Sequence, residues 1–113
     1  MNKIEKLIYE RELLTDLKER LESTGRLETF ISYVMAQGAE KQIQLETLLT
    51  QEKDSLSNIA QKIEYLKIEY KVYKKLYTHI LLKKLSGESY DETHIIEIIS
   101  DALEEIYEII MED

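Results

Sequence analysis

The sequence contains no cysteine and no proline, and only three of its 113 residues are glycine. Without cysteine the chain can form neither a disulfide framework nor a thiolate metal site. The scarcity of glycine and proline disfavours a turn-rich sandwich or barrel. Long apolar runs are also missing, and the charges scattered through the opening residues, MNKIEKLIYERELL, do not fit a signal peptide. These absences predict an all-α protein in the cytoplasm.

Charge is distributed unevenly along the chain, whose formal net charge is -8. Residues 62–85 carry seven lysines against two glutamates, whereas residues 86–113 carry ten acidic residues and no lysine or arginine. An acidic surface repels phosphates, so we do not expect the whole surface to bind nucleic acid. The length of the chain and its 43% of hydrophobic residues predict a single helical domain over residues 1–113.

The longest periodic segment lies between residues 39 and 85. Its apolar residues recur at spacings of three and four, the a/d heptad pattern of a helix that buries one seam against another helix. We interpret the following positions as an interaction seam: Leu56, Ile59, Ile63, Leu66, Tyr70, Tyr73, Tyr77 and Ile80. Neither glycine nor proline interrupts the segment, which predicts one long, coiled-coil-like central helix. Because shorter helices would not cover so long a seam, we also expect a homodimer.

An antiparallel four-helix bundle is the alternative interpretation of this segment. Between Thr50 and Asn58 the sequence is rich in Thr, Asp and Ser, which are poor formers of a helix interior. A reversal of the chain near residues 50–55 would produce four helices of similar length. We favour the continuous helix because a tight turn between helices usually recruits glycine or proline.

Shorter helices are expected on both sides of the central one. Asn2 is a favourable N-cap for the first helix, and Gly25 can end it in a left-handed conformation. Gly38 offers either a joint before the central helix or a glycine tolerated within a helix, and Gly87 offers a C-cap after it. The predicted helices cover residues 2–23, 26–37, 39–85 and 89–112.

Helical spacing also predicts two charged faces. The basic face of the central helix consists of Lys67, Lys71, Lys74 and Lys75. Lysines interleaved with tyrosines can neutralise phosphates and stack bases, so the segment from Lys62 to Lys84 is a candidate for contact with nucleic acid. The acidic face of the last helix consists of Glu97, Asp101, Glu104 and Glu108. Such a ridge can imitate phosphates and bind the basic groove of a nucleic-acid enzyme.

The sequence offers no convincing catalytic or metal-binding set. His79 and His94 lie on different predicted helices, without the activated nucleophile that covalent catalysis needs. Asp91, His94 and Glu97 could share one side of a helix, but the di-metal sites of bundles need Glu-x-x-His on two helices. We therefore expect no enzymatic activity, no cofactor and no metal site.

These observations favour a non-enzymatic helical interaction protein. It would regulate or inhibit a partner protein by docking a helix face, with Tyr and Ile side chains as anchors, in the manner of small proteins encoded by phages and mobile elements. Two alternatives remain open. One is a transcription-associated regulator that contacts nucleic acid through the Lys62–Lys84 helix, and the other is an acidic DNA mimic that inhibits a nucleic-acid enzyme. None of the three involves a membrane.

Overall fold

The computed structural model describes residues 2–50, 56–87 and 91–112, with only the backbone described at residues 56–58. These residues form four helices, α1 (Lys3–Thr24), α2 (Leu27–Thr50), α3 (Leu56–Leu85) and α4 (Glu92–Glu112), and no strand. The predicted all-α class is confirmed. Within the described ranges, none of the helices combines the length and the apolar character that crossing a membrane requires.

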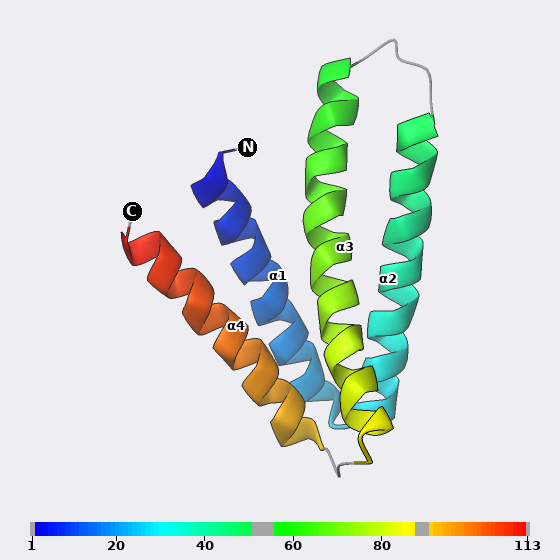
Figure 1. Cartoon of the computed structure of the whole chain (residues 1–113), viewed down its shortest axis with the longest axis vertical. Helices are drawn as coiled ribbons and strands as arrows, with labels where there is room; N and C mark the ends of the chain where they lie inside the picture. The colour runs from blue at the N-terminus through cyan, green and yellow to red at the C-terminus, as the bar shows by residue number, and fades with distance from the viewer. Residues whose placement is uncertain (1, 51–55, 88–90, 113) are drawn as a thin grey trace.

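The helices pack as a bundle in which successive helices run in opposite directions (Figure 1). The most extensive contact is between α2 and α3, and the next is between α1 and α4. α1 also packs against α2 and α3, whereas α3 and α4 touch each other very little. In the view of Figure 1, α1 lies between α4 and α3, and the α1–α4 pair diverges from α3 toward the chain termini.

The prediction of a single helix over residues 39–85 is wrong, because the described residues of this segment belong to two helices. α2 ends at Thr50, α3 begins at Leu56, and the two helices lie side by side (Figure 1). The alternative, a helical bundle, is the observed arrangement. Folding back lets the apolar seams of α2 and α3 cover each other within one chain, so this seam no longer needs a second copy to bury it. The reversal predicted near residues 50–55 falls largely on residues 51–55, which lie outside the described part of the chain.

The helix boundary expected at Gly38 is also absent, because α2 runs unbroken from Leu27 to Thr50. A Cβ atom placed on Gly38 would lie 3.5 Å from the Cβ atom of Tyr73 on α3. Gly38 therefore lies within a continuous helix and packs against α3, at a distance that an alanine would also fill. The contact shows that residue 38 lies opposite residue 73.

Local capping explains the ends of α1 and α3. The Asn2 side chain accepts a hydrogen bond from the backbone N–H of Glu5 at 2.8 Å, which satisfies a free donor in the first turn of α1. Gly25 ends α1 with a φ of 64°, and Gly87 follows α3 with a φ of 73°. Both glycines hold the left-handed conformation predicted for them, which strains any residue with a side chain. At the start of α4, Asp91 Oδ1 accepts a hydrogen bond from the backbone N–H of His94.

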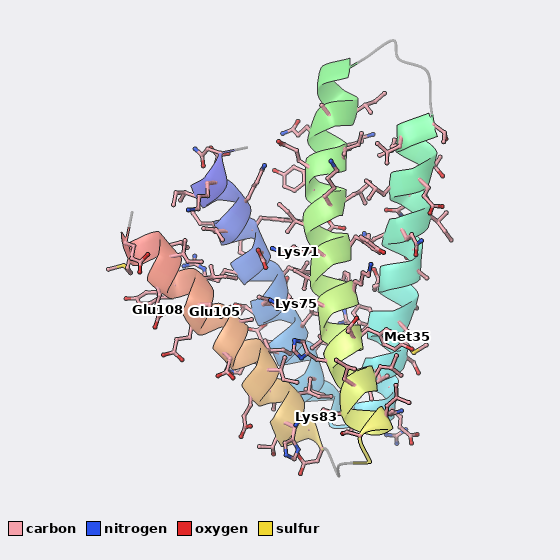
Figure 2. The ribbon with its side chains drawn as sticks, viewed as in Figure 1. Met35, Lys71, Lys75, Lys83, Glu105 and Glu108 are labelled. Atoms are coloured by element: carbon pink, nitrogen blue, oxygen red, sulfur yellow. The ribbon has the colours of Figure 1, made fainter. Side chains whose placement is uncertain are left out.

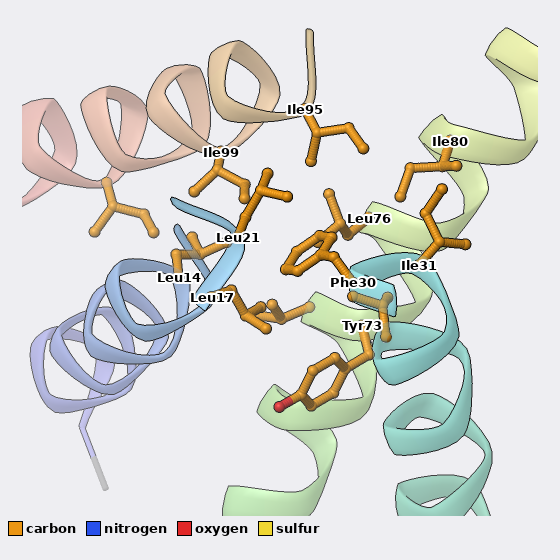
Figure 3. Close-up of a cluster of buried hydrophobic side chains, with 13 residues drawn as sticks. Leu14, Leu17, Leu21, Phe30, Ile31, Tyr73, Leu76, Ile80, Ile95 and Ile99 are labelled. Carbon is orange, nitrogen blue, oxygen red and sulfur yellow. The ribbon is translucent and has the colours of Figure 1, made fainter. Parts of the chain in front are cut away.

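The hydrophobic core gathers buried side chains from all four helices (Figure 3). Its buried members are Leu14, Leu17, Leu21, Phe30, Ile31, Val34, Val72, Tyr73, Leu76, Ile80, Ile95, Ile99 and Ile106. α2 contributes no fully buried side chain after Val34. Beyond that point Leu45 and Leu48 of α2 are only partly buried, although Tyr9 of α1 still contacts Tyr65 in the first half of α3.

The fold-back of α3 onto α2 predicts a short distance between labels on the two helices. The chain has no cysteine, so Glu46→Cys and Lys67→Cys give two specific attachment sites on exposed positions. A continuous helix would separate these backbone positions by about 32 Å. Packed helices whose axes are about 8–10 Å apart should bring them to less than half that distance. Electron–electron distance measurement on spin labels reads the difference directly.

A matched pair of labels controls for the length of the linkers. Ala60→Cys and Leu81→Cys are separated by the same number of residues, and both lie within α3. This control pair should give about 32 Å. Equal distances for the two pairs would contradict the bundle.

Substitutions at Gly38 should distinguish a packing role from a hinge. Gly38→Ala should stabilise the protein by up to about 1 kcal/mol, because alanine favours the helix and its Cβ has room beside Tyr73. Gly38→Leu should destabilise it by about 1–3 kcal/mol, because a longer side chain forces α2 and α3 apart. Ala39→Leu, at the exposed neighbouring position, should change stability by less than about 0.5 kcal/mol. Urea unfolding followed by circular dichroism measures all three, and a harmless leucine at position 38 would contradict the close approach.

Candidate interaction groove

A groove of about 240 Å³ runs over α1 between α3 and α4. It forms because α4 packs on α1 and scarcely contacts α3, so the space above α1 stays open. Apolar side chains from all three helices make its floor: Leu14, Val72, Leu76, Ile98, Ile99 and Ala102. The edges of the core are therefore accessible here, as they are in many binding sites.

The two walls of the groove carry opposite charges. Lys75 lines the α3 wall, and Asp101 and Glu105 line the α4 wall. Lys71 lies one turn before Lys75, and its Nζ atom is 3.7 Å from Oε2 of Glu10 at the edge of the floor. Figure 2 labels Lys71 and Lys75 on α3 and Glu105 on α4. Within the described part of the chain, Lys75, Asp101 and Glu105 form no ion pair.

The predicted interaction seam lies within the bundle. Leu66, Tyr73 and Ile80 are buried, Ile59, Ile63, Tyr70 and Tyr77 are partly buried, and the side chain of Leu56 lies outside the described residues. Val72 and Leu76 are buried as well, although the heptad spacing omits them. The buried side of α3 is wider than a two-helix seam because α1 and α2 both pack against it.

All four lysines of the predicted basic face are exposed on α3. Lys74 places its Nζ atom 5.4 Å from the centre of the Tyr70 ring, within the range of a cation–π contact. Beside these lysines, Tyr70, Thr78 and Leu82 form a shallow strip that is largely apolar. The structure therefore places a hydrophobic surface next to the basic face.

The four carboxylates of the predicted acidic face are exposed on α4, and none forms an ion pair in the part that the structure describes. They follow one side of α4, and Asp101 lies where this side borders the groove. Two large apolar side chains interleave with the outer carboxylates: Tyr107 is 56% exposed and Met111 is 66% exposed. We call Glu104, Tyr107, Glu108 and Met111 the outer face of α4.

A polar network that the sequence analysis did not identify joins three helices. The Tyr9 hydroxyl on α1 donates a hydrogen bond to Oε1 of Glu69 on α3. Lys41 on α2 places its Nζ atom 2.8 Å from Oε2 of the same carboxylate. This contact lies outside the geometry of a directed hydrogen bond, so charge attraction stabilises the buried oxygen. Burial, followed by the bond to Glu69, raises the pKa of Tyr9, which keeps its hydroxyl protonated and able to donate.

The sequence does contain a signal for this network. Lys41 lies seven residues after Val34, three after Gly38 and four before Leu45. At this helical spacing a charged residue occupies the apolar side of α2. Glu69 lies on the buried side of α3, three residues after Leu66. Two opposite charges on facing apolar sides indicate a pair, but only once the two helices are known to pack together.

The histidines do not form a reactive centre in the described residues. His79 lines the groove and is exposed, and it forms no hydrogen bond or ion pair with another described residue. His94 accepts a hydrogen bond through Nδ1 from the backbone N–H of Asp91 at 3.1 Å, which is a capping role at the start of α4. No cluster of His, Asp and Glu in the described ranges is arranged to hold a metal ion.

Comparison of the chain with protein-family models, with curated proteins and with solved structures finds no match.

Removal of Lys41 should weaken the bundle because it leaves the Glu69 carboxylate without its counterion. Lys41→Met should lower the free energy of unfolding by about 1–3 kcal/mol. The surface pair of Lys6 and Glu64, 3.8 Å apart, provides the control, and Lys6→Met should cost less than about 1 kcal/mol. Lys41→Met combined with Glu69→Met should be more stable than Lys41→Met alone, as thermal unfolding would measure. A combined variant that is less stable than the single one would contradict the pairing.

Proposed function

We propose that this chain is a non-enzymatic interaction protein that regulates or inhibits a partner protein by docking the outer face of α4. The observation that carries the proposal is the exposure of Tyr107 and Met111 between unpaired carboxylates. Tyrosine and methionine are enriched in protein interfaces, because each buries a large area on binding. An acidic surround would orient a basic partner and accelerate its association.

The anchors in this proposal differ from those expected from the sequence. Tyr73 and Ile80 are buried and belong to the core, so they are not available to a partner. Tyr107 lies one turn before Met111, and Glu104 and Glu108 accompany them on the same side of α4. A partner that covers this surface would bury two apolar side chains at the centre and leave the carboxylates at the rim. This is the arrangement of a typical interface hot spot.

The chemical character of the groove supports a binding role. Its titratable side chains include one lysine, three carboxylates and one histidine, without a serine or threonine hydroxyl among the lining residues. An apolar floor between walls of opposite charge suits the docking of an amphipathic surface.

Nucleic-acid binding through α3 is the second candidate. It is favoured by the exposure of Lys67, Lys71, Lys74 and Lys75 and by the contact of Lys74 with the Tyr70 ring. Asp101 and Glu105, across the groove, oppose it because they would repel phosphates. A gel shift at low salt that is lost on changing Lys71, Lys74 and Lys75 to Glu would favour this candidate over the docking of a protein.

Docking on the outer face of α4 predicts that two exposed side chains control capture of the partner. Wild-type chain immobilised on a resin should retain a basic protein from a lysate of the cells that make it. Tyr107→Ala with Met111→Ala should lose that protein, since anchor side chains typically contribute about 2 kcal/mol or more. Ile43→Ala with Leu49→Ala removes two similarly exposed side chains from α2 and should retain it. Titration of the purified partner against the three chains then gives the dissociation constants.

The same experiment distinguishes a DNA mimic from other regulators. If the captured protein binds nucleic acid, added duplex DNA should displace it. Glu97→Gln with Glu104→Gln and Glu108→Gln should lower its affinity, and this loss relative to the wild-type chain should be larger at low salt than at high salt. An unchanged set of captured proteins after both anchor substitutions would refute docking through the outer face.

A further inference from the structure

We propose that a second copy of this chain seats on the α3–α4 face, with the lysine wall of each groove against the acidic wall of the other. This interface uses Lys71 and Lys75 on α3 and Asp101 and Glu105 on α4. It uses neither Tyr107 nor Met111, the anchors of the outer face of α4, so it goes beyond the proposed function and does not depend on it.

The first support is that Lys75, Asp101 and Glu105 face one groove without neutralising one another. Lys75 and the two carboxylates of α4 line the same groove, yet no ion pair joins them in the described part of the chain. Lys71 contacts Glu10 at 3.7 Å, and its side chain remains 64% exposed. Charges that stand unpaired on two walls of an open groove are available to groups from a second molecule.

The second support is symmetry, because this face is complementary to itself. One protomer presents a basic helix on one side of the groove and an acidic helix on the other (Figure 2). A two-fold axis parallel to the groove places α3 of each protomer against α4 of its partner, which pairs opposite charges twice. An axis across the groove would instead place α4 against α4 and bring like charges together. A second copy of the chain therefore presents a wall of opposite charge to each wall of the groove.

Helix direction agrees with this axis. Within a protomer α3 and α4 run in opposite directions (Figure 1), and a two-fold axis parallel to the groove preserves that relation between protomers. Each α3 would therefore meet its partner's α4 in the antiparallel sense, as neighbouring helices do in bundles. The interface would extend the packing pattern of the chain across two molecules.

Apolar contact accompanies the charges on α3. Leu82 is 59% exposed and lies seven residues after Lys75, on the same side of the helix. With Tyr70 and Thr78 it forms the shallow apolar strip beside the lysines. Exposed ion pairs alone hold molecules together weakly, so this strip supplies area that the charges do not. The lysines then set the orientation.

Light scattering of the wild-type chain at low salt should give twice the mass of one chain. At about 1 M salt the screening length falls to about 3 Å, and the mass should fall toward that of a monomer. Lys71→Glu with Lys75→Glu should be monomeric at low salt, and so should Asp101→Lys with Glu105→Lys. Arg26→Glu with Lys62→Glu makes the same change in net charge at exposed positions outside the groove and should remain dimeric.

Mixing the two monomeric variants provides the decisive measurement. The basic wall of one is now acidic and the acidic wall of the other is now basic, so a one-to-one mixture should restore a dimer that contains both. No folding defect can produce such a rescue. If a reversed chain fails to fold, as circular dichroism would reveal, the neutral variants Lys71→Gln with Lys75→Gln and Asp101→Asn with Glu105→Gln replace it and should each weaken the dimer.

Three results would overturn the proposal: a wild-type monomer at low salt, dimers that survive either reversal, or a mixture of folded variants that stays monomeric. None of them bears on the outer face of α4, because Tyr107 and Met111 are unchanged in these variants. A monomeric chain that still captures its partner would refute the dimer and leave the docking function standing.

Discussion

The packing of α2 against α3 is the constraint on which the rest of the structure depends. α3 is apolar on more than half of its circumference, and α2 covers only one side of it. Val72 and Leu76 remain on the other side, and α1 covers them with Leu14 and Leu17. α4 then packs on α1 rather than on α3. The groove follows from this order. α1, α3 and α4 all contribute to its floor, and the space between α3 and α4 stays open because these two helices scarcely contact each other.

Local features of the sequence predicted those parts of the fold that local physics decides. Gly25 and Gly87 end helices because a left-handed backbone strains any other common residue, whatever the rest of the chain does. The choice between one long helix and two packed helices is different, because the heptad seam of α3 fits a partner from another chain or from the same chain equally well. Gly38 was interpreted as a joint for the same reason. Its role depends on Tyr73, which is 35 residues away and opposite it only after folding.

In the candidate site, too, the sequence predicted features within one helix but not relations between helices. Helical spacing correctly grouped the lysines of α3 and the carboxylates of α4 on exposed faces, since each group lies on one helix. It could not indicate that Lys75 and Asp101 line one groove, or that Lys41 and Glu69 form a pair. These relations need the positions of two helices. Glu105 was missed for that reason, because its importance comes from the lysine wall opposite it.

Both proposals arise from the electrostatic position of α4. The helix carries seven acidic residues and no lysine or arginine, so its charges repel one another at neutral pH. Its core side uses Ile95, Ile99 and Ile106, which leaves one broad acidic surface exposed, from the edge of the groove to the outer face. The chain contains lysines that could compensate the groove side, but Lys71 is paired with Glu10 and Lys75 reaches no carboxylate. Both proposals supply α4 with positive charge from a second molecule, which would lower this self-repulsion. If either is correct, a helix of this composition should be more stable in the complex than alone.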